Sequence, residues 1–239
     1  MSKTRETKHA PGQLIDKTES WQVVSHEVLA KAHIVALSQD VVYSPSGEAM
    51  VREMISHPGA VAIMALDEQG RIAVVHQYRH AVRMRLVEPP AGLLDVAGES
   101  ALAAAQRELA EEAGLAADDW RVLVDFATSP GISDEVLRVY LARGLRSVPR
   151  PAGFEAHGEE VDMGLEWLPL SDAVDGVRAG LYHNVTFCMG SQALALALAE
   201  GAIDKLRPGD APWPMRQRVL DAKQARSGGM VRDAAASGV

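Results

Sequence analysis

The feature that most constrains the fold of this chain is an acidic segment that also contains its clearest helix pattern. Residues 88–119 hold eight carboxylates and one cation, so their net charge is −7 (one minus eight), nearly the −8 of all 239 residues. Within this segment, residues 100–113 begin at Ser100, continue mostly in Ala and Leu, and end before Gly114. A serine N-cap and a glycine after the last turn are typical of a helix with fixed ends. The sequence therefore predicts one capped α-helix here.

Three glutamates crowd one side of this predicted helix. Glu108 and Glu112 are four residues apart, and Glu111 is three residues from Glu108. Like charges at such spacings cost an isolated helix about 0.2–0.5 kcal/mol per pair, and Arg107 is the only cation in the segment. Clustered oxygen ligands are what Mg²⁺ and Mn²⁺ prefer. The spacing favours a divalent metal site, although on its own it leaves open a solvated acidic face.

Composition and charge exclude several classes of protein. Apolar residues make up 47% and charged residues 23% of the chain, as in soluble globular proteins. The single cysteine, Cys188, excludes a scaffold held by disulfides within the chain. The net negative charge argues against nucleic acid and anionic membranes as partners. No apolar run exceeds seven residues, which is too short to span a bilayer. With a polar N-terminus and no signal peptide, we expect a cytoplasmic protein.

The order of the patterns predicts two folded parts and two tails. Residues 1–18 are polar and predict a flexible N-terminus. Residues 19–58 form short β-rich stretches and predict an antiparallel meander, too small to have a core of its own. Residues 59–208 contain a hairpin, the capped helix, three further strands and two more helices. Residues 209–239 are expected to form a C-terminal tail, a solvated helix in its first part, with Trp213 as an anchor against the core.

The residues around the predicted helix match a known signature. Glu99 is followed, after seven residues, by Arg107-Glu-Leu-Ala-Glu-Glu-Ala-Gly-Leu115. This resembles the signature of the Nudix hydrolases, G-x5-E-x7-R-E-U-x-E-E-x-G-U, where U is aliphatic. Every fixed position from Glu99 to Leu115 matches. The departure lies at the start, because six residues rather than five separate Gly92 from Glu99. This insertion precedes the helix, so it is expected to affect only the geometry around Gly92.

The resemblance implies a fold, a metal and a set of roles. The implied fold class is α/β, the Nudix α/β/α sandwich, behind the small N-terminal antiparallel β-domain. Members of the family split a diphosphate linked to another group with the help of divalent metals, here Mg²⁺ or Mn²⁺. By the resemblance, Glu108, Glu112 and the backbone carbonyl of Ala91 hold the metal. Glu111 assists catalysis, and Arg107 orients the glutamates through salt bridges.

Three features outside the signature resemble the ADP-ribose pyrophosphatases. Residues 129–135, Ser-Pro-Gly-Ile-Ser-Asp-Glu, are similar to a downstream segment of that subfamily, although Pro-Gly is also a common turn pair. A long loop, residues 146–160, carries Glu160 as the implied catalytic base and Glu159 as the alternative; a solvated loop tip explains the same residues without a function. The N-terminal meander resembles a domain that is exchanged across a two-fold homodimer and helps to cover the adenine.

The same resemblance assigns three substrate contacts. Arg79 matches an arginine that holds substrate phosphate, and Arg52 matches, more loosely, one near the adenine or ribose. Glu135 is expected, together with Arg79, to hold phosphate and ribose. Each arginine could instead be an ordinary surface residue. The run at residues 88–99 makes the resemblance especially close to enzymes of high-GC Gram-positive (actinobacterial) bacteria.

The expected activity is Mg²⁺-dependent hydrolysis of ADP-ribose to AMP and ribose 5-phosphate by a cytoplasmic homodimer. One alternative is a Nudix hydrolase for another nucleoside diphosphate derivative, such as a nucleotide sugar or a dinucleotide. A second alternative is a catalytically silent Nudix domain that senses ADP-ribose. The complete set of glutamates argues against silence, because a sensor has no need to keep all of it.

Overall fold

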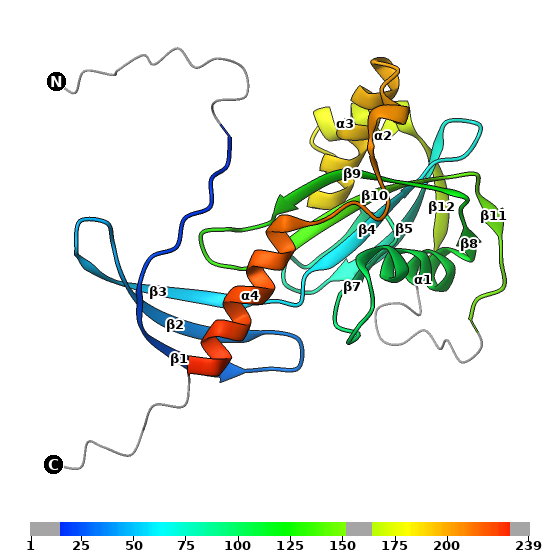
Figure 1. The fold of residues 1–239 in the computed structure, drawn as a ribbon. Helices are drawn as coiled ribbons and strands as arrows, with labels where there is room; N and C mark the ends of the chain where they lie inside the picture. The colour runs from blue at the N-terminus through cyan, green and yellow to red at the C-terminus, as the bar shows by residue number, and fades with distance from the viewer. Residues whose placement is uncertain (1–14, 152–163, 230–239) are drawn as a thin grey trace, which may run out of the picture.

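The computed structural model describes residues 15–151 and 164–229. It has two parts, a three-stranded sheet at the N-terminal end and a larger α/β part (Figure 1). The three-stranded sheet is the predicted meander, and its strands pair antiparallel in chain order: β1 (Val23–Lys31), β2 (Ala36–Tyr43) and β3 (Ala49–Ser56). Nearly every side chain of β1 is exposed. The meander therefore buries little apolar surface by itself, as its small size predicts.

The larger part is built on a five-stranded sheet. Its strands, in spatial order, are β13 (Arg207–Pro208), β9 (Asp119–Ala127), β10 (Val136–Arg143), β4 (Ala60–Ala65) and β7 (Ala91–Leu93). The inner strands β4 and β10 run parallel and are buried along nearly their whole length. A parallel pair covered on both faces gives a near-continuous apolar run, which explains the apolar stretch that begins at Ala60.

Two smaller sets of strands complete the larger part. One sheet has the order β12 (Leu165–Pro169), β5 (Arg71–Arg79) and β6 (Met84–Glu88). A short pair, β8 (Leu115–Ala116) with β11 (Arg146–Ser147), joins the residues after the capped helix to the start of the long loop. The hairpin partner β6 and the short β7 were not expected from the sequence, because neither shows a sustained apolar alternation.

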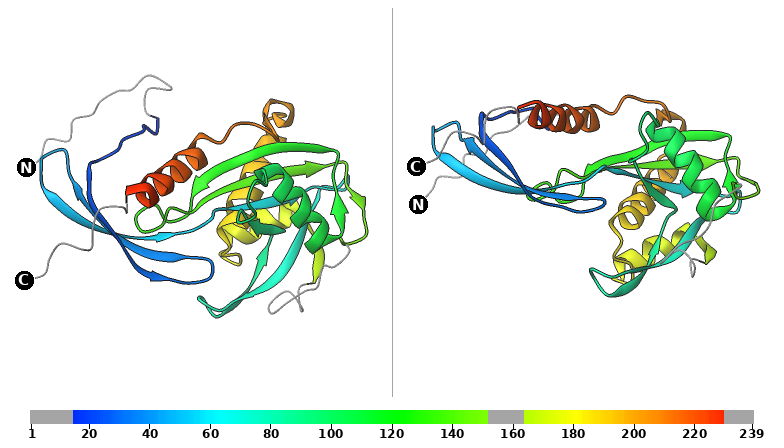
Figure 2. Two further views of the ribbon diagram at one scale, coloured as in Figure 1. Left: turned by 60° about the horizontal axis from the view of Figure 1, so that its bottom comes forward. Right: turned by 90° about the horizontal axis from the view of Figure 1, so that it is seen from below.

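Helices cover both faces of the five-stranded sheet, as Figure 2 shows from two sides. α1 (Ala101–Ala113) packs on one face, and α2 (Leu170–Arg178) with α3 (Val185–Ala199) packs on the other. A 3₁₀ turn, η2 (Ile203–Lys205), leads from α3 to β13. No helix within the two described ranges is long and apolar enough to cross a membrane. The predicted α/β/α sandwich is confirmed.

The side chains of β4 show how one strand serves both layers. Val61 and Ile63 belong to the core beneath α1, whereas Ala62 and Met64 belong to the core beneath α2 and α3. Successive side chains of a strand point to opposite faces, so a strand between two helical layers needs apolar residues at every position.

The ends of α1 are those that the sequence predicts. The side chain of Ser100 accepts a hydrogen bond from the backbone N–H of Ala103 at 3.1 Å. Gly114 has a φ of 62° and donates its N–H to the carbonyl of Ala110. This left-handed conformation suits glycine, so the helix begins and ends at fixed residues. The position of its glutamates relative to the sheet is fixed with it.

The C-terminal helix α4 (Pro214–Gly229) connects the two parts of the molecule (Figure 1). Just before it, Trp213 is buried in the core beneath α1, which confirms the predicted anchor. Further along, Arg226 lies 3.3 Å from the buried carboxylate of Asp40 on β2. The expectation of a solvated helix is therefore wrong in part for the described part of α4. Arg226 pairs with a carboxylate of the N-terminal sheet and Lys223 with Asp134 of the larger part, whereas Arg218 is exposed.

The packing of α1 gives a test of this architecture. Leu109 is fully buried between α1 and the sheet, so we expect Leu109→Ala to lower the free energy of unfolding by about 2–5 kcal/mol. Urea denaturation followed by circular dichroism measures this change. Leu196→Ala, on the exposed side of α3, is the control and should change it by less than about 0.5 kcal/mol. Equal effects of the two changes would contradict the placement of α1.

Candidate active site

A cavity of about 790 Å³ opens where β5, β7 and α1 meet the loop after β9 and the start of α3. Ile34, from the loop between β1 and β2, also lines it, so the N-terminal sheet reaches the cavity. Six of the nine site residues predicted from the sequence line its wall: Arg79, Ala91, Glu108, Glu111, Glu112 and Glu135. The fold thus brings together residues that are far apart in the sequence.

The carboxylate of Glu108 lies directly against the backbone of Gly92. A Cβ atom added to Gly92 would stand 2.0 Å from the carboxylate of Glu108, a separation that atoms cannot adopt. A side chain at position 92 would therefore force the carboxylate of Glu108 away from β7. The six residues between Gly92 and Glu99 lie mostly in the loop between β7 and α1, and Gly92 itself contacts Glu108 of α1.

Glu112, one turn further along α1, is bonded to the neighbouring residue of β7. Its Oε2 accepts a hydrogen bond from the backbone N–H of Ala91 at 3.0 Å. Ala91 is held in place by its pairing with Ala62 of β4. The three residues predicted to hold metal, Ala91, Glu108 and Glu112, therefore lie together at the junction of α1 and β7.

Arg107 ties the crowded carboxylates together. Its Nε and Nη2 donate to the two oxygens of Glu99, each at 3.0 Å. Its Nη1 donates to Glu108 at 2.7 Å and to Glu111 at 3.0 Å. The salt bridges predicted for Arg107 are confirmed. Its hydrogen bonds lower the pKa of Glu99, and the same pairing raises the pKa of Arg107. One cation thus offsets part of the repulsion on this face of α1.

Arg79 is oriented by a carboxylate to which the sequence analysis assigned no role. Its Nε and Nη2 donate to the two oxygens of Glu88, at 2.9 and 2.6 Å. The side chain of Glu88 is only 2% exposed, and a buried carboxylate needs such a partner. Both residues line the cavity. The signal in the sequence was the charged Glu88 at the end of a β-stretch, before Pro89 and Pro90.

Glu135 lies on the wall of the cavity with two polar neighbours. Its Oε2 accepts a hydrogen bond from the hydroxyl of Thr128 at 2.6 Å, and its Oε1 lies 3.3 Å from Nδ1 of His57. Thr128 and His57 also line the cavity. Neither was identified from the sequence, because a lone Thr and a lone His beside a Pro-Gly break carry no motif.

The remaining predicted residues are not brought to the cavity by the described structure. Arg52 lies exposed on β3, where its guanidinium donates to the carbonyl of Val51 at 2.8 Å, and it does not line the cavity in this chain. Glu159 and Glu160 lie outside the described residues. Their roles stay predictions.

The donor set suits Mg²⁺ or Mn²⁺. Mg²⁺ commonly takes one or two carboxylates and leaves its other positions to water and substrate phosphate. Within residues 15–151 and 164–229, no three acidic, His or Cys side chains form a closed cluster around a point. An ion completed by water and phosphate has no need of such a cage. Gly92 has no side chain, so the carboxylate of Glu108 can lie beside Ala91 and Glu112. This group of oxygen ligands is the feature that fits the ion.

Comparison with known proteins decides the family. The family model of the NUDIX domain matches residues 56–185, more than half of the chain. This chain belongs to the Nudix family. This Nudix protein is 46% identical, over 205 residues, to the ADP-ribose pyrophosphatase of Mycobacterium tuberculosis (strain ATCC 25618 / H37Rv). That alignment covers 86% of this chain and 97% of the relative.

Further matches extend this comparison. The chain is 36% identical to the methanol dehydrogenase activator of Bacillus methanolicus, with 73% of this chain and 92% of that protein covered. A solved structure described as an ADP compounds hydrolase superposes with a TM-score of 0.64, covering 79% of this chain and all of that one. Its sequence identity is 18%, so this likeness supports the Nudix fold alone.

The contact between Gly92 and Glu108 gives the first test of the site. Because a Cβ atom would displace the carboxylate of Glu108, we expect Gly92→Ala to weaken Mn²⁺ binding by about tenfold or more, measured by electron paramagnetic resonance of free Mn²⁺. Gly164→Ala is the control, since nothing lies within 4 Å of the added Cβ there. Equal Mn²⁺ affinity of the two variants would contradict this placement of Glu108.

The pairing of Glu99 with Arg107 predicts a pH dependence of stability. Since Arg107 lowers the pKa of Glu99 in the folded state, the pair stabilises the fold above the ordinary carboxyl pKa of 4.5. That contribution is lost as the pH falls through the lower, folded-state pKa. We therefore expect Glu99→Gln to melt at a lower temperature than the wild type at neutral pH, and the difference to shrink in acid. A difference that stays constant down to about pH 3 would argue against the pair.

Proposed function

We propose that this Nudix protein hydrolyses the diphosphate bond of ADP-ribose to AMP and ribose 5-phosphate, with Mg²⁺ or Mn²⁺ as cofactor. The observation that carries the proposal is the relative named ADP-ribose pyrophosphatase, 46% identical over 97% of its length. The cavity supports it, because the glutamates of the Nudix helix and the substrate residues Arg79 and Glu135 line the same wall. A site for a nucleoside diphosphate needs ligands for a divalent metal and, close to them, groups that bind phosphate and ribose.

The chemistry assigns a task to each of these residues. Water adds to one phosphorus, the bridging P–O bond breaks, and the second phosphate leaves with its sugar. Glu108, Glu112 and the carbonyl of Ala91 would hold the metal, which would supply charge neutralisation at the phosphates and a lower pKa for the attacking water. Arg79 orients phosphate through its fixed guanidinium, and Glu135 accepts hydrogen bonds from ribose hydroxyls.

The remaining roles belong to the catalytic base and to Glu111. Glu160, with Glu159 as the alternative, takes the proton of the attacking water when substrate is bound, a role that needs only reach and not a fixed position beforehand. Glu111 assists at the metal, either directly or through water. The bond from Arg107 to Glu111 orients that carboxylate toward the cavity.

We further propose that the protein is a homodimer formed through its N-terminal sheet, and that it acts in the cytoplasm. Apolar side chains are exposed along this sheet, among them Val23, Val28, Leu37 and Val51. By the strand register, Val23 and Val28 share one face of the sheet, and Leu37 and Val51 share the other. Exposed apolar side chains on a small sheet favour burial in an interface. In such a dimer, Arg52 would contact the adenine or ribose held by the other subunit.

The relatives leave two alternatives to be tested. Because the relatives carry different names, one alternative is that the substrate is another nucleoside diphosphate derivative, such as a nucleotide sugar or a dinucleotide. The relative named as an activator keeps open a protein whose main task is regulation.

Glu112 tests the proposal directly. Removing its charge weakens the metal side of the cavity, so we expect Glu112→Gln to lower the rate of AMP release from ADP-ribose by more than about tenfold with an unchanged melting temperature. Glu68→Gln, an exposed turn residue, is the matched control and should retain full activity. A fully active Glu112→Gln variant would overturn the metal assignment.

A further inference from the structure

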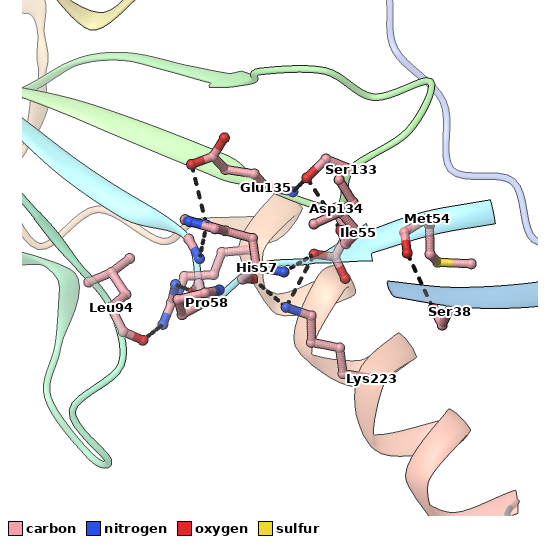
Figure 3. A network of polar contacts seen from close by, with 12 residues as sticks. Ser38, Met54, Ile55, His57, Pro58, Leu94, Ser133, Asp134, Glu135 and Lys223 are labelled. Carbon is pink, nitrogen blue, oxygen red and sulfur yellow. Dashed lines mark hydrogen bonds and ion pairs between the residues drawn. The ribbon is translucent and has the colours of Figure 1, made fainter. Parts of the chain in front are cut away.

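Residues 57–59 join β3 of the N-terminal sheet to β4 of the larger part, and their backbone is held by groups distant in the sequence (Figure 3). The N–H of His57 donates to Oδ1 of Asp134 at 2.8 Å. The carbonyl of His57 accepts a hydrogen bond from Nζ of Lys223 on α4 at 2.5 Å. The backbone N–H and the backbone carbonyl of His57 are thus both bound by side chains.

Lys223 closes this arrangement into a ring. Its Nζ also lies 3.3 Å from Oδ1 of Asp134, the oxygen that accepts the N–H of His57. The two side chains are 25% and 13% exposed. A hydrogen bond or ion pair that is mostly shielded from water is stronger than an exposed one. The ring therefore fixes His57 relative to Asp134.

Arg216, two turns before Lys223 on α4, binds the next residues of the same segment. Its Nη1 donates to the carbonyl of Pro58 at 2.9 Å, and its Nη2 donates to the carbonyl of Leu94 at 3.5 Å. Leu94 also donates its N–H to the carbonyl of Gly59 at 3.0 Å. Gly59 has a φ of +85°, and an added Cβ there would stand 2.9 Å from Arg216. Only a glycine permits this approach.

Lys223 and Arg216, together with the backbone of residues 57–59 and Leu94 that they bind, form a clamp. The clamp lies next to residues that line the cavity. His57 lines the cavity and faces Glu135, the residue that directly follows Asp134. Leu94 directly precedes Asp95, which lies between β7 and α1 in the sequence and also lines the cavity. The cations of α4 therefore hold the backbone at His57 and beside Asp95, two residues that line the cavity, although neither Lys223 nor Arg216 is among its lining residues.

We propose that α4 is a positioning element of the substrate cavity, with Lys223 and Arg216 as positioning residues. They fix the backbone of residues 57–59. Through Asp134, which binds His57 and Lys223, they also fix the neighbouring Glu135 at the cavity. This inference rests on the proposed function, because it concerns the same cavity. Preorganised contacts bind better than ones that must be ordered on binding, so loosening the clamp weakens substrate binding more than it slows the chemical step at the metal.

Lys223→Met tests the clamp, because it keeps most of the length of the side chain and removes its ammonium group and hydrogen bonds. We expect KM for ADP-ribose to rise by about tenfold, with kcat within about twofold of wild type. Lys223→Arg, which can donate to the same two oxygens, should recover most of the affinity. Arg218→Met removes an exposed cation from the same helix and should leave both constants unchanged.

A second readout needs no substrate. In amide hydrogen exchange of the full chain, Lys223→Met should speed exchange in peptides covering residues 55–60 and 132–136, whereas Arg218→Met should not. An unchanged KM in a folded Lys223→Met variant, or unchanged exchange in these peptides, would overturn the clamp. A wild-type protein that fails to hydrolyse ADP-ribose would instead contradict the proposed function, and the exchange experiment would still decide the clamp.

Discussion

The crowding of carboxylates on one face of α1 is the constraint on which the rest of the structure depends. Glu108, Glu111 and Glu112 repel one another, and Arg107 offsets part of that repulsion through bonds to Glu99, Glu108 and Glu111. The remaining carboxylates line the cavity, where we propose that a divalent cation binds. The N-cap at Ser100, the glycine at position 114 and the contact at Gly92 all serve to fix this face against β7.

The parts of the fold that were predictable are those in which neighbouring residues carry the information. α1 was predicted to the residue, because its caps and its apolar face lie within fifteen positions of sequence. The apolar run that begins at Ala60 predicted a strand, but the hairpin expected with the following strand is wrong. β4 pairs with β10 and β7, whereas β5 belongs to another sheet. The family signature then placed Ala91, Glu108, Glu111 and Glu112, all of which line one cavity.

The parts that were missed depend on contacts between distant residues. The role of Glu88 is visible only when Arg79 stands beside it across a β-hairpin. The basic residues of α4 looked solvated because their partners, Asp40 and Asp134, are far away in sequence. Such pairs are fixed by the way the two parts of the molecule meet, and no local pattern reports them.

The measurement that tests the central claim most directly is a comparison of kcat/KM for ADP-ribose, nucleotide sugars and dinucleotides, each with Mg²⁺ and with EDTA. The account predicts turnover that EDTA abolishes and that favours ADP-ribose by about tenfold or more, with AMP and ribose 5-phosphate as products. Preference for another compound would contradict the substrate, and activity that survives EDTA would contradict the metal site. Tight binding of ADP-ribose without turnover of any compound would identify a sensor rather than an enzyme.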